Sequence, residues 1–174
     1  MLTCIINSMK GRDVAIADIP DAFLQTDMVN GDCTVSVRIC GVLADIMDKT
    51  DPEKFANNVV QEGGQKVIYA YLKKALYGAL IGILLFRQDL SGVLGSWGFK
   101  PNPYDSCVMN KKVNSKQFTN FWRVDDLKIF HVILKIVDGV LSKLTTKYGK
   151  VSSLSVSRGR THDYLSMRLD HSTK

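Results

Sequence analysis

The chain has 174 residues, of which 45% are hydrophobic and 23% charged, the composition of a globular domain that can bury a core. Lys and Arg outnumber Asp and Glu by 23 to 17, a net charge of +6 that suits a polyanionic partner without requiring one. The four cysteines, Cys4, Cys33, Cys40 and Cys107, form no CxxC pair, which argues against a zinc or redox motif, and the apolar stretch 75–86 is too short to span a bilayer. We therefore expect one intracellular domain with reduced, mostly buried thiols and no membrane partner.

The first strand is predicted just after Gly11, where Val14, Ile16 and Asp18 alternate with other residues. Pro20 cannot donate to a strand ladder, so this strand must end close to Asp18. The sequence therefore places the Asp18 carboxylate at the end of a strand.

The segment between Asp18 and the middle of the chain has weaker patterns. A short strand is predicted over 34–39, and Thr50-Asp51-Pro52-Glu53 has the residues of a helix start, for a helix that fades by Val60. A further strand over 67–72 is apolar on both faces, which predicts burial on both sides.

Two longer helices are predicted from apolar residues at helical spacing. The first covers 84–97 and stops at Gly98, and the second covers 132–148 and stops at Gly149. The second has a continuous apolar stripe, so it must pack on a sheet or a partner.

Three strands are predicted between these helices, over 106–111, 117–122 and 127–131. The first two are joined by a turn at Val113-Asn114-Ser115-Lys116, and the last two by a tight turn that contains Asp125 and Asp126. Asp is a common turn residue because its side chain caps its own backbone, so the pair alone indicates only a turn. If the strand ends lie side by side, however, Asp18 joins the pair, and three carboxylates are the ligands of a two-metal site for phosphoryl transfer.

Several segments, in this order, resemble copia-type retrotransposon reverse transcriptases. Ile16-Ala17-Asp18-Ile19-Pro20-Asp21-Ala22-Phe23-Leu24-Gln25 is similar to the first catalytic motif of the family, and Val124-Asp125-Asp126-Leu127 to its catalytic hairpin. The segments between and after them are Leu72-Lys73-Lys74-Ala75-Leu76-Tyr77-Gly78, Trp97-Gly98-Phe99 with Tyr104-Asp105-Ser106-Cys107-Val108, and Arg158-Gly159-Arg160-Thr161-His162-Asp163-Tyr164-Leu165-Ser166-Met167. The resemblance covers nearly the whole chain, 1–174, as a single domain truncated at both ends.

The resemblance implies an α+β fold, a palm-like antiparallel sheet with helices packed on one face and with incomplete fingers and thumb. It implies that Asp18, Asp125 and Asp126 are catalytic and bind two Mg²⁺ (or Mn²⁺) ions, with the primer 3′-hydroxyl as nucleophile. The implied partners are an RNA template, a DNA primer, deoxynucleoside triphosphates and other polyprotein domains such as integrase and RNase H. The implied location is cytoplasmic, in a virus-like particle, or nuclear.

The resemblance also implies roles for nine further residues. Ile19, Phe23, Tyr77 and Gly78 would bind the nucleotide, with Phe23 excluding a 2′-hydroxyl. A plain core aromatic is the alternative interpretation of Phe23, and its place in the motif favours the nucleotide role. Primer and template would be bound by Arg123, Lys128, Arg158, Arg160 and His162. For Arg158, Arg160 and His162, a solvated basic face is an equally good interpretation.

Three positions depart from the family pattern. Arg123 stands where Tyr is frequent, the polar segment expected after Gly78 is replaced by the apolar residues 79–84, and Ser166 stands where Gly is usual. These departures keep a second hypothesis open, a catalytically inactive nucleic-acid-binding remnant. A metal-dependent phosphohydrolase with water as nucleophile is a third.

Overall fold

The computed structural model describes residues 11–28, 35–159, 161–164 and 167–170. The chain has an α+β fold in which all the pairings between described strands are antiparallel. The strands are β1 (Asp13–Asp18), β2 (Ser36–Cys40), β3 (Val59–Glu62), β4 (Gln65–Tyr71), β5 (Lys100–Pro101), β6 (Val108–Val113), β7 (Lys116–Arg123), β8 (Asp126–His131), β9 (Ser155–Arg158), β10 (Thr161–Tyr164) and β11 (Met167–Asp170). The α-helices are α2 (Val42–Thr50), α3 (Pro52–Phe55), α4 (Leu80–Ser96) and α5 (Leu134–Tyr148), and the 3-10 turns are η1 (Phe23–Gln25) and η2 (Ala56–Asn58).

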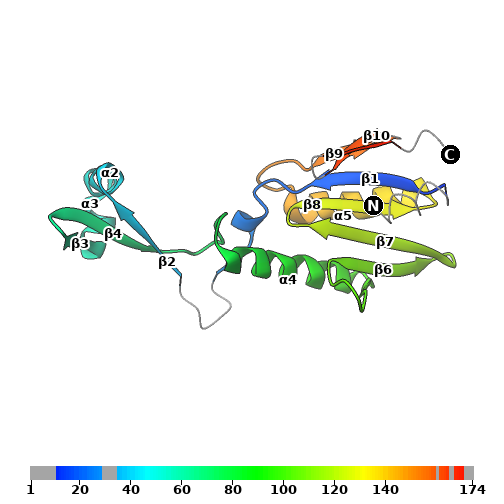
Figure 1. Ribbon diagram of the computed structural model, residues 1–174, viewed down its shortest axis with the longest axis horizontal. Coiled ribbons are helices and arrows are strands. Elements are labelled where there is room, and N and C mark those ends of the chain that lie inside the picture. Colours follow the sequence, from blue (N-terminus) through cyan, green and yellow to red (C-terminus); the bar gives the residue numbers. More distant parts are fainter. Residues whose placement is uncertain (1–10, 29–34, 160, 165–166, 171–174) are drawn as a thin grey trace.

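The larger part of the molecule, here called the body, is a six-stranded sheet with strand order β5-β6-β7-β8-β1-β9 and the helices α4 and α5 (Figure 1). Strands β6, β7 and β8 form a meander, and β1 inserts between β8 and β9. The centre of the sheet therefore joins the first described strand to the hairpin that contains Asp125 and Asp126.

Both long helices pack on one face of the body sheet. Ala15 and Ala17 of β1 and Leu127 and Ile129 of β8 are fully buried, and they belong to the same core cluster as the apolar stripes of the helices. The helical members are Phe86, Leu90 and Leu94 of α4 and Val137, Val140, Leu141, Leu144 and Tyr148 of α5. Because side chains alternate along a strand, the residues between these positions face the opposite side.

That opposite side has a smaller core. Val14, Ile16 and Phe130 form a separate buried cluster with Tyr164 of β10. The β10–β11 hairpin therefore covers part of the face that the helices leave open, and β10 contacts β1 and β9.

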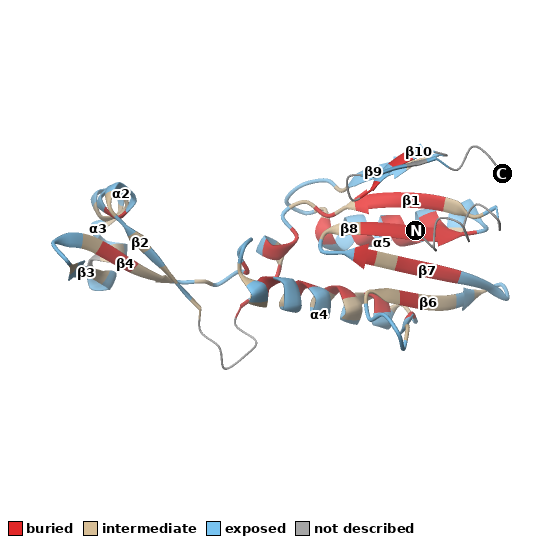
Figure 2. Ribbon diagram, viewed as in Figure 1, coloured by how far each residue is buried: buried red, intermediate tan, exposed pale blue. Residues whose placement is uncertain are grey.

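The remaining elements form an arm, residues 35–72, which extends from the body along the long axis of the molecule (Figure 1). It is a three-stranded sheet of order β2-β4-β3 with α2 and α3 beside it. The fully buried residues on the described part of the arm are Ala44, Val67 and Ile68, so most of it is coloured as intermediate or exposed (Figure 2).

Most of the predicted strands and both long helices are confirmed. The strand ending at Asp18, the three-strand meander with its turn at 113–116 and the helix ending at Gly149 are present, and α4 starts at Leu80, four residues before the predicted start. The chain contains no helix, within its described part, that is long and apolar enough to cross a membrane.

The short helix predicted from Thr50-Asp51-Pro52-Glu53 is present as α3, followed by η2, and it ends before Val60, whereas the nine-residue helix α2 before it was not predicted. Two predictions are wrong. Strand β4 is not buried on both sides along its length, since Tyr71 is exposed at the edge of the thin arm sheet. The thiols of Cys40 and Cys107 are free but not buried, and Cys4 and Cys33 lie outside the described residues.

Candidate active site

Asp18 and Asp126 lie directly opposite each other on neighbouring strands. Strand β1 ends at Asp18 and β8 begins at Asp126, and the antiparallel register pairs the two residues. The next residue, Ile19, donates its backbone N–H to the carbonyl oxygen of Asp125 at 3.2 Å. The expected convergence of the three acidic residues is therefore present in the fold.

The two carboxylates belong to a row of side chains that crosses four strands. Arg123 of β7 pairs with Asp126, Asp126 with Asp18, and Asp18 with Ser155 of β9. All four positions alternate with residues that face α4 and α5, so the row lies on the face of the sheet opposite the helices. A substrate can approach this row without displacing either helix.

The turn between β7 and β8 holds Asp125 next to Asp126. Arg123 and Asp126 close the hairpin, which leaves Val124 and Asp125 as its two loop residues. Val124 has a φ of 57°, a backbone conformation that is unfavourable for a β-branched residue and that favours glycine. Such strain persists only where the flanking structure fixes it, here the two paired strands.

The electrostatics of the site are those of an uncompensated acidic cluster. Partial burial and then the neighbouring Asp125 and Asp126 carboxylates raise the pKa of Asp18 above its ordinary value. Burial and then Asp125 raise the pKa of Asp126. Within the described ranges, none of the three forms a salt bridge, not even with Arg123 directly opposite Asp126.

The donor set fits a divalent cation by its chemistry. Carboxylate oxygens are the preferred ligands of Mg²⁺, and a cation would offset both the burial and the mutual repulsion that raise the pKa of Asp18 and of Asp126. The side chains are not already arranged as a cage, since no group of three or more His, Cys, Asp or Glu side chains in the described ranges could hold a metal ion as it stands. Rotation of the carboxylates about their side-chain bonds would be needed for joint coordination.

Of the four residues expected to bind a nucleotide, two are buried. Ile19 is fully buried and Phe23 is 3% exposed, with its ring 4.4 Å from the ring of Tyr77 and 6.1 Å from that of Phe86. This position fits the alternative reading of Phe23 as a core aromatic, and its nucleotide role stays a prediction.

Tyr77 and Gly78 are accessible at the edge of the acidic site. Tyr77 is 46% exposed, and burial of its hydroxyl, with Asp125 as the next contributor, raises the pKa of its phenol. Gly78 has a φ of +90° and open space where a Cβ would lie. The glycine is therefore required by its backbone conformation, not by a close neighbour in the fold.

The residues expected to bind primer and template are dispersed. Arg123 is exposed in the acidic row, while Lys128 of β8 and His162 of β10 are each 1% exposed. The Lys128 ammonium lies 5.9 Å from the Tyr164 ring centre. The His162 ring lies 3.4 Å from the Ser157 hydroxyl oxygen.

Arg158 pairs with two carboxylates of the body. Its guanidinium lies 3.0 Å from Asp13 and 2.8 Å from Asp138 of α5, on the helix side of the sheet. The geometry therefore gives Arg158 a structural role and no support for primer binding. Arg160 lies outside the described residues.

Sequence reasoning missed Ser155, which completes the row beside Asp18. No strand was predicted at 155–158, because Ser155-Val156-Ser157-Arg158 has a single apolar residue, and three of its four residues are exposed at the edge of the sheet. A search for acidic or basic residues could not have found this position.

The chain matches no protein-family model, no curated protein and no solved structure. A function for this chain is therefore inferred from its own residues and their geometry.

Proposed function

We propose that this chain is the palm of an RNA-directed DNA polymerase, which transfers a deoxynucleotide onto the 3′-hydroxyl of a primer paired to an RNA template. The observation that carries the proposal is the direct pairing of Asp18 with Asp126, beside Asp125, on the helix-free face of an antiparallel sheet. The motifs of the copia-type family lie at these same positions. Integrase and RNase H domains of a polyprotein are the proposed partners.

Asp18, Asp125 and Asp126 would hold two Mg²⁺ or Mn²⁺ ions. When bound, the ions would lower the pKa of the attacking hydroxyl and offset the charge that develops on the phosphate. The pKa values of Asp18 and Asp126, raised first by burial and then by the neighbouring carboxylates, support a role for such counter-charge. The pairing of β1 with β8 fixes the two backbones before substrate arrives, which limits the entropy lost on binding.

The reaction forms a bond between the primer 3′-oxygen and the α-phosphorus, breaks the bond to the bridging oxygen of the pyrophosphate group, and releases the hydroxyl proton. The exposed Arg123 guanidinium, in the same row, is placed to pair with a phosphate, because the described residues give it no internal carboxylate partner. Tyr77 offers an accessible aromatic ring on which a base or sugar can pack.

A nucleic-acid-binding protein without catalytic activity is the second candidate. It is favoured by the absence, in the described ranges, of a ready metal cage, and by the exposure of Leu80, Ile83 and Leu84 next to Tyr77 and Gly78. Apolar side chains at that place offer no hydrogen bonds to a nucleotide.

Primer extension on an RNA template with Mg²⁺ tests the proposal. Asp126→Asn should lower the extension rate by about 10³-fold or more, because a loss of several kcal/mol of charge stabilisation has that effect. Asp45→Asn, an exposed position on α2 with the same change of charge, is the matched control and should extend like the wild type.

Two outcomes would count against polymerase activity. If Asp126→Asn extends primers at the wild-type rate, the acidic row has no role in the reaction. Salt-sensitive binding of primer-template by the wild type, with no extension in Mg²⁺ or Mn²⁺, would select the non-catalytic alternative.

A further inference from the structure

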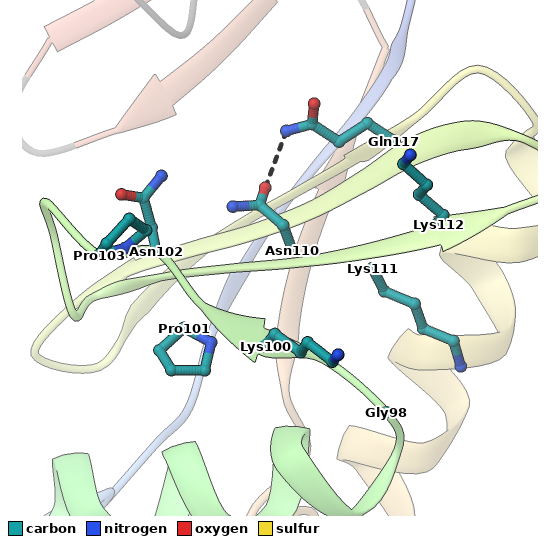
Figure 3. A pocket seen from close by; sticks show the side chains of 9 residues that line it. All are labelled: Gly98, Lys100, Pro101, Asn102, Pro103, Asn110, Lys111, Lys112 and Gln117. Atoms are coloured by element: carbon teal, nitrogen blue, oxygen red, sulfur yellow. Dashed lines mark hydrogen bonds between the residues drawn. The ribbon is translucent and has the colours of Figure 1, made fainter.

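A second feature of the body is a cavity of about 650 Å³ at the β5 edge of the sheet. It is lined by Lys100 and Pro101 of β5, Asn102 and Pro103 that follow, Asn110, Lys111 and Lys112 of β6, Gln117 of β7, and Gly98 (Figure 3). None of these lining residues is acidic. Its charge is therefore opposite to that of the Asp18 row.

The two exposed lysines of the cavity are free to bind a ligand. Lys100 and Lys112 form no salt bridge with any residue in the described part of the chain. Lys111 is different, because its ammonium donates to the carbonyl oxygen of Trp97 at 2.7 Å and lies 5.7 Å from the centre of the Phe99 ring. Lys111 thus stabilises the body, and Lys100 and Lys112 supply the available charge.

The asparagines of the cavity present donors to it. The side-chain oxygen of Asn110 accepts hydrogen bonds from the amide of Gln117 at 2.8 Å (dashed in Figure 3) and from the hydroxyl of Thr119 at 2.7 Å. The side-chain oxygen of Asn102 accepts the backbone N–H of Tyr104 at 2.8 Å. With these oxygens engaged, each NH₂ group has no acceptor among the described residues and remains available to an anion.

Asn110, Lys112 and Gln117 place one side of the cavity on the same face of the sheet as the acidic row, whereas Lys111 lies on the helix side. Asn110 pairs with Thr119, and Thr119 with Phe130, which belongs to the helix-free face with Val14. Gln117 and Arg123 are both exposed on β7, six residues apart, or about 20 Å at the rise of a strand. Because a duplex rises about 3.4 Å per base pair, that distance is about six base pairs.

We propose that this cavity binds the sugar-phosphate backbone of the nucleic acid whose 3′ end lies at the acidic row. The proposal rests on the proposed function for the identity of the ligand. Two ammonium groups and two amide NH₂ groups, without a carboxylate, match the acceptor oxygens of a phosphate. The described part of the C-terminal hairpin packs on β1 and β9 and, through Tyr164, on Phe121 of β7.

Fluorescence anisotropy with RNA–DNA hairpins tests the cavity in the full chain. For a hairpin with about 12 base pairs, Lys100→Ala with Lys112→Ala should weaken binding about tenfold and reduce the slope of log K against log salt by about 2. The control is Lys135→Ala with Lys150→Ala, which removes the same charge from exposed positions on α5 and just after it.

Hairpin length separates a specific contact from a general loss of charge. A hairpin of about 4 base pairs is too short to reach from the acidic row to the cavity, so its binding should fall no more than with the control pair. Equal weakening of long and short hairpins, or equal effects of the two double variants, would overturn the proposal.

Asn110→Asp gives an independent measurement at nearly constant shape. The carboxylate still accepts from Gln117 and Thr119, but its second oxygen replaces the NH₂ donor, so binding of the long hairpin should fall about three- to tenfold. Unchanged binding would overturn the proposal. Primer extension by the wild type is measured separately. If the protein binds the hairpin through the cavity but does not extend primers, only the proposed polymerase activity is refuted.

Discussion

The body and the arm are both antiparallel sheets with helices packed beside them, but they bury apolar side chains to very different extents. The body sheet has a core on each face, one with α4 and α5 and one with Tyr164. On the described arm, Ala44, Val67 and Ile68 are fully buried, while Val42 is 75% exposed. The arm instead has ion pairs, Arg38 with Glu62 at 2.8 Å and Lys66 with Asp48 at 2.6 Å.

The difference indicates which part of the chain can hold a site rigidly. Exposed ion pairs contribute little to stability, and a thin sheet with few buried contacts opens locally at low cost. The acidic row and the basic cavity both lie on the body, where two-sided burial fixes β1, β7 and β8. We expect the body to unfold as one unit and the arm to open independently.

The largest effect on stability is expected from Leu127→Ala, in the fully buried centre of β8. Removal of a buried leucine costs about 2–5 kcal/mol, a large part of the 5–15 kcal/mol that stabilises a typical domain. Urea unfolding followed by tryptophan fluorescence measures the body, since Trp97 and Trp122, the two tryptophans of the chain, both belong to or pack on its core. Leu43→Ala, at an exposed arm position, is the control, and an equal shift in both would contradict the two-sided core.

A smaller and local effect is expected from Ile68→Ala on the arm. Ile68 is fully buried, so its truncation should cost about 2–4 kcal/mol, but within the arm alone. Hydrogen exchange should become faster over 59–71. The free energy of unfolding measured by tryptophan fluorescence should stay the same within about 0.5 kcal/mol. A loss as large as that of Leu127→Ala would show that arm and body unfold together.

The smallest effect, and one of opposite sign, is expected from Asp18→Asn. The raised pKa of Asp18 means that its stabilising contribution is complete below the ordinary value of 3.8 and is lost as the pH rises through the higher folded value. At neutral pH the variant should therefore melt at a higher temperature than the wild type.

Calorimetry at several pH values checks this sign. The difference between variant and wild type should disappear in acid, and Mg²⁺ should raise the melting temperature of the wild type only, because it binds the ionised carboxylates. If the variant is less stable than the wild type at neutral pH, and this difference does not change in acid, the ionised Asp18 carboxylate does not destabilise the fold.

The sequence was sufficient for the central body strands β1, β6, β7 and β8, but not for the body edge strands β5 and β9 or for helix α2 of the arm. Strand β1, the meander and α5 have strong alternation or helical periodicity, and the turns at 113–116 and at Asp125-Asp126 follow from their residue types. Helix α2 was missed because it starts after Gly41, which has a φ of 66° and no side chain that could cap the helix. The residues typical of a helix start, Thr50-Asp51-Pro52, lie where α2 ends and the shorter α3 begins.

The site was predictable in part for a similar reason. Asp18 and Asp126 could be placed together because both flank strong central strands. The Arg158 ion pairs and the burial of Lys128 depend on long-range packing against α5 and the C-terminal hairpin, for which the local sequence has no signal. Asn120 shows the same limit, since it is fully buried on the helix side of β7 between Phe118 and Trp122.

The chain leaves the body for the arm and returns through two segments that run side by side. Met28 donates its backbone N–H to Lys73 at 3.0 Å, Ala75 donates to Thr26 at 3.0 Å, and Leu72 donates to Val35 at 2.9 Å. Since entry and exit lie next to each other, the arm is a module inserted at one point of the body's path. Evolution or engineering could exchange it for another folded unit with adjacent termini, and the chain path that brings Asp18 to Asp126 would be unchanged.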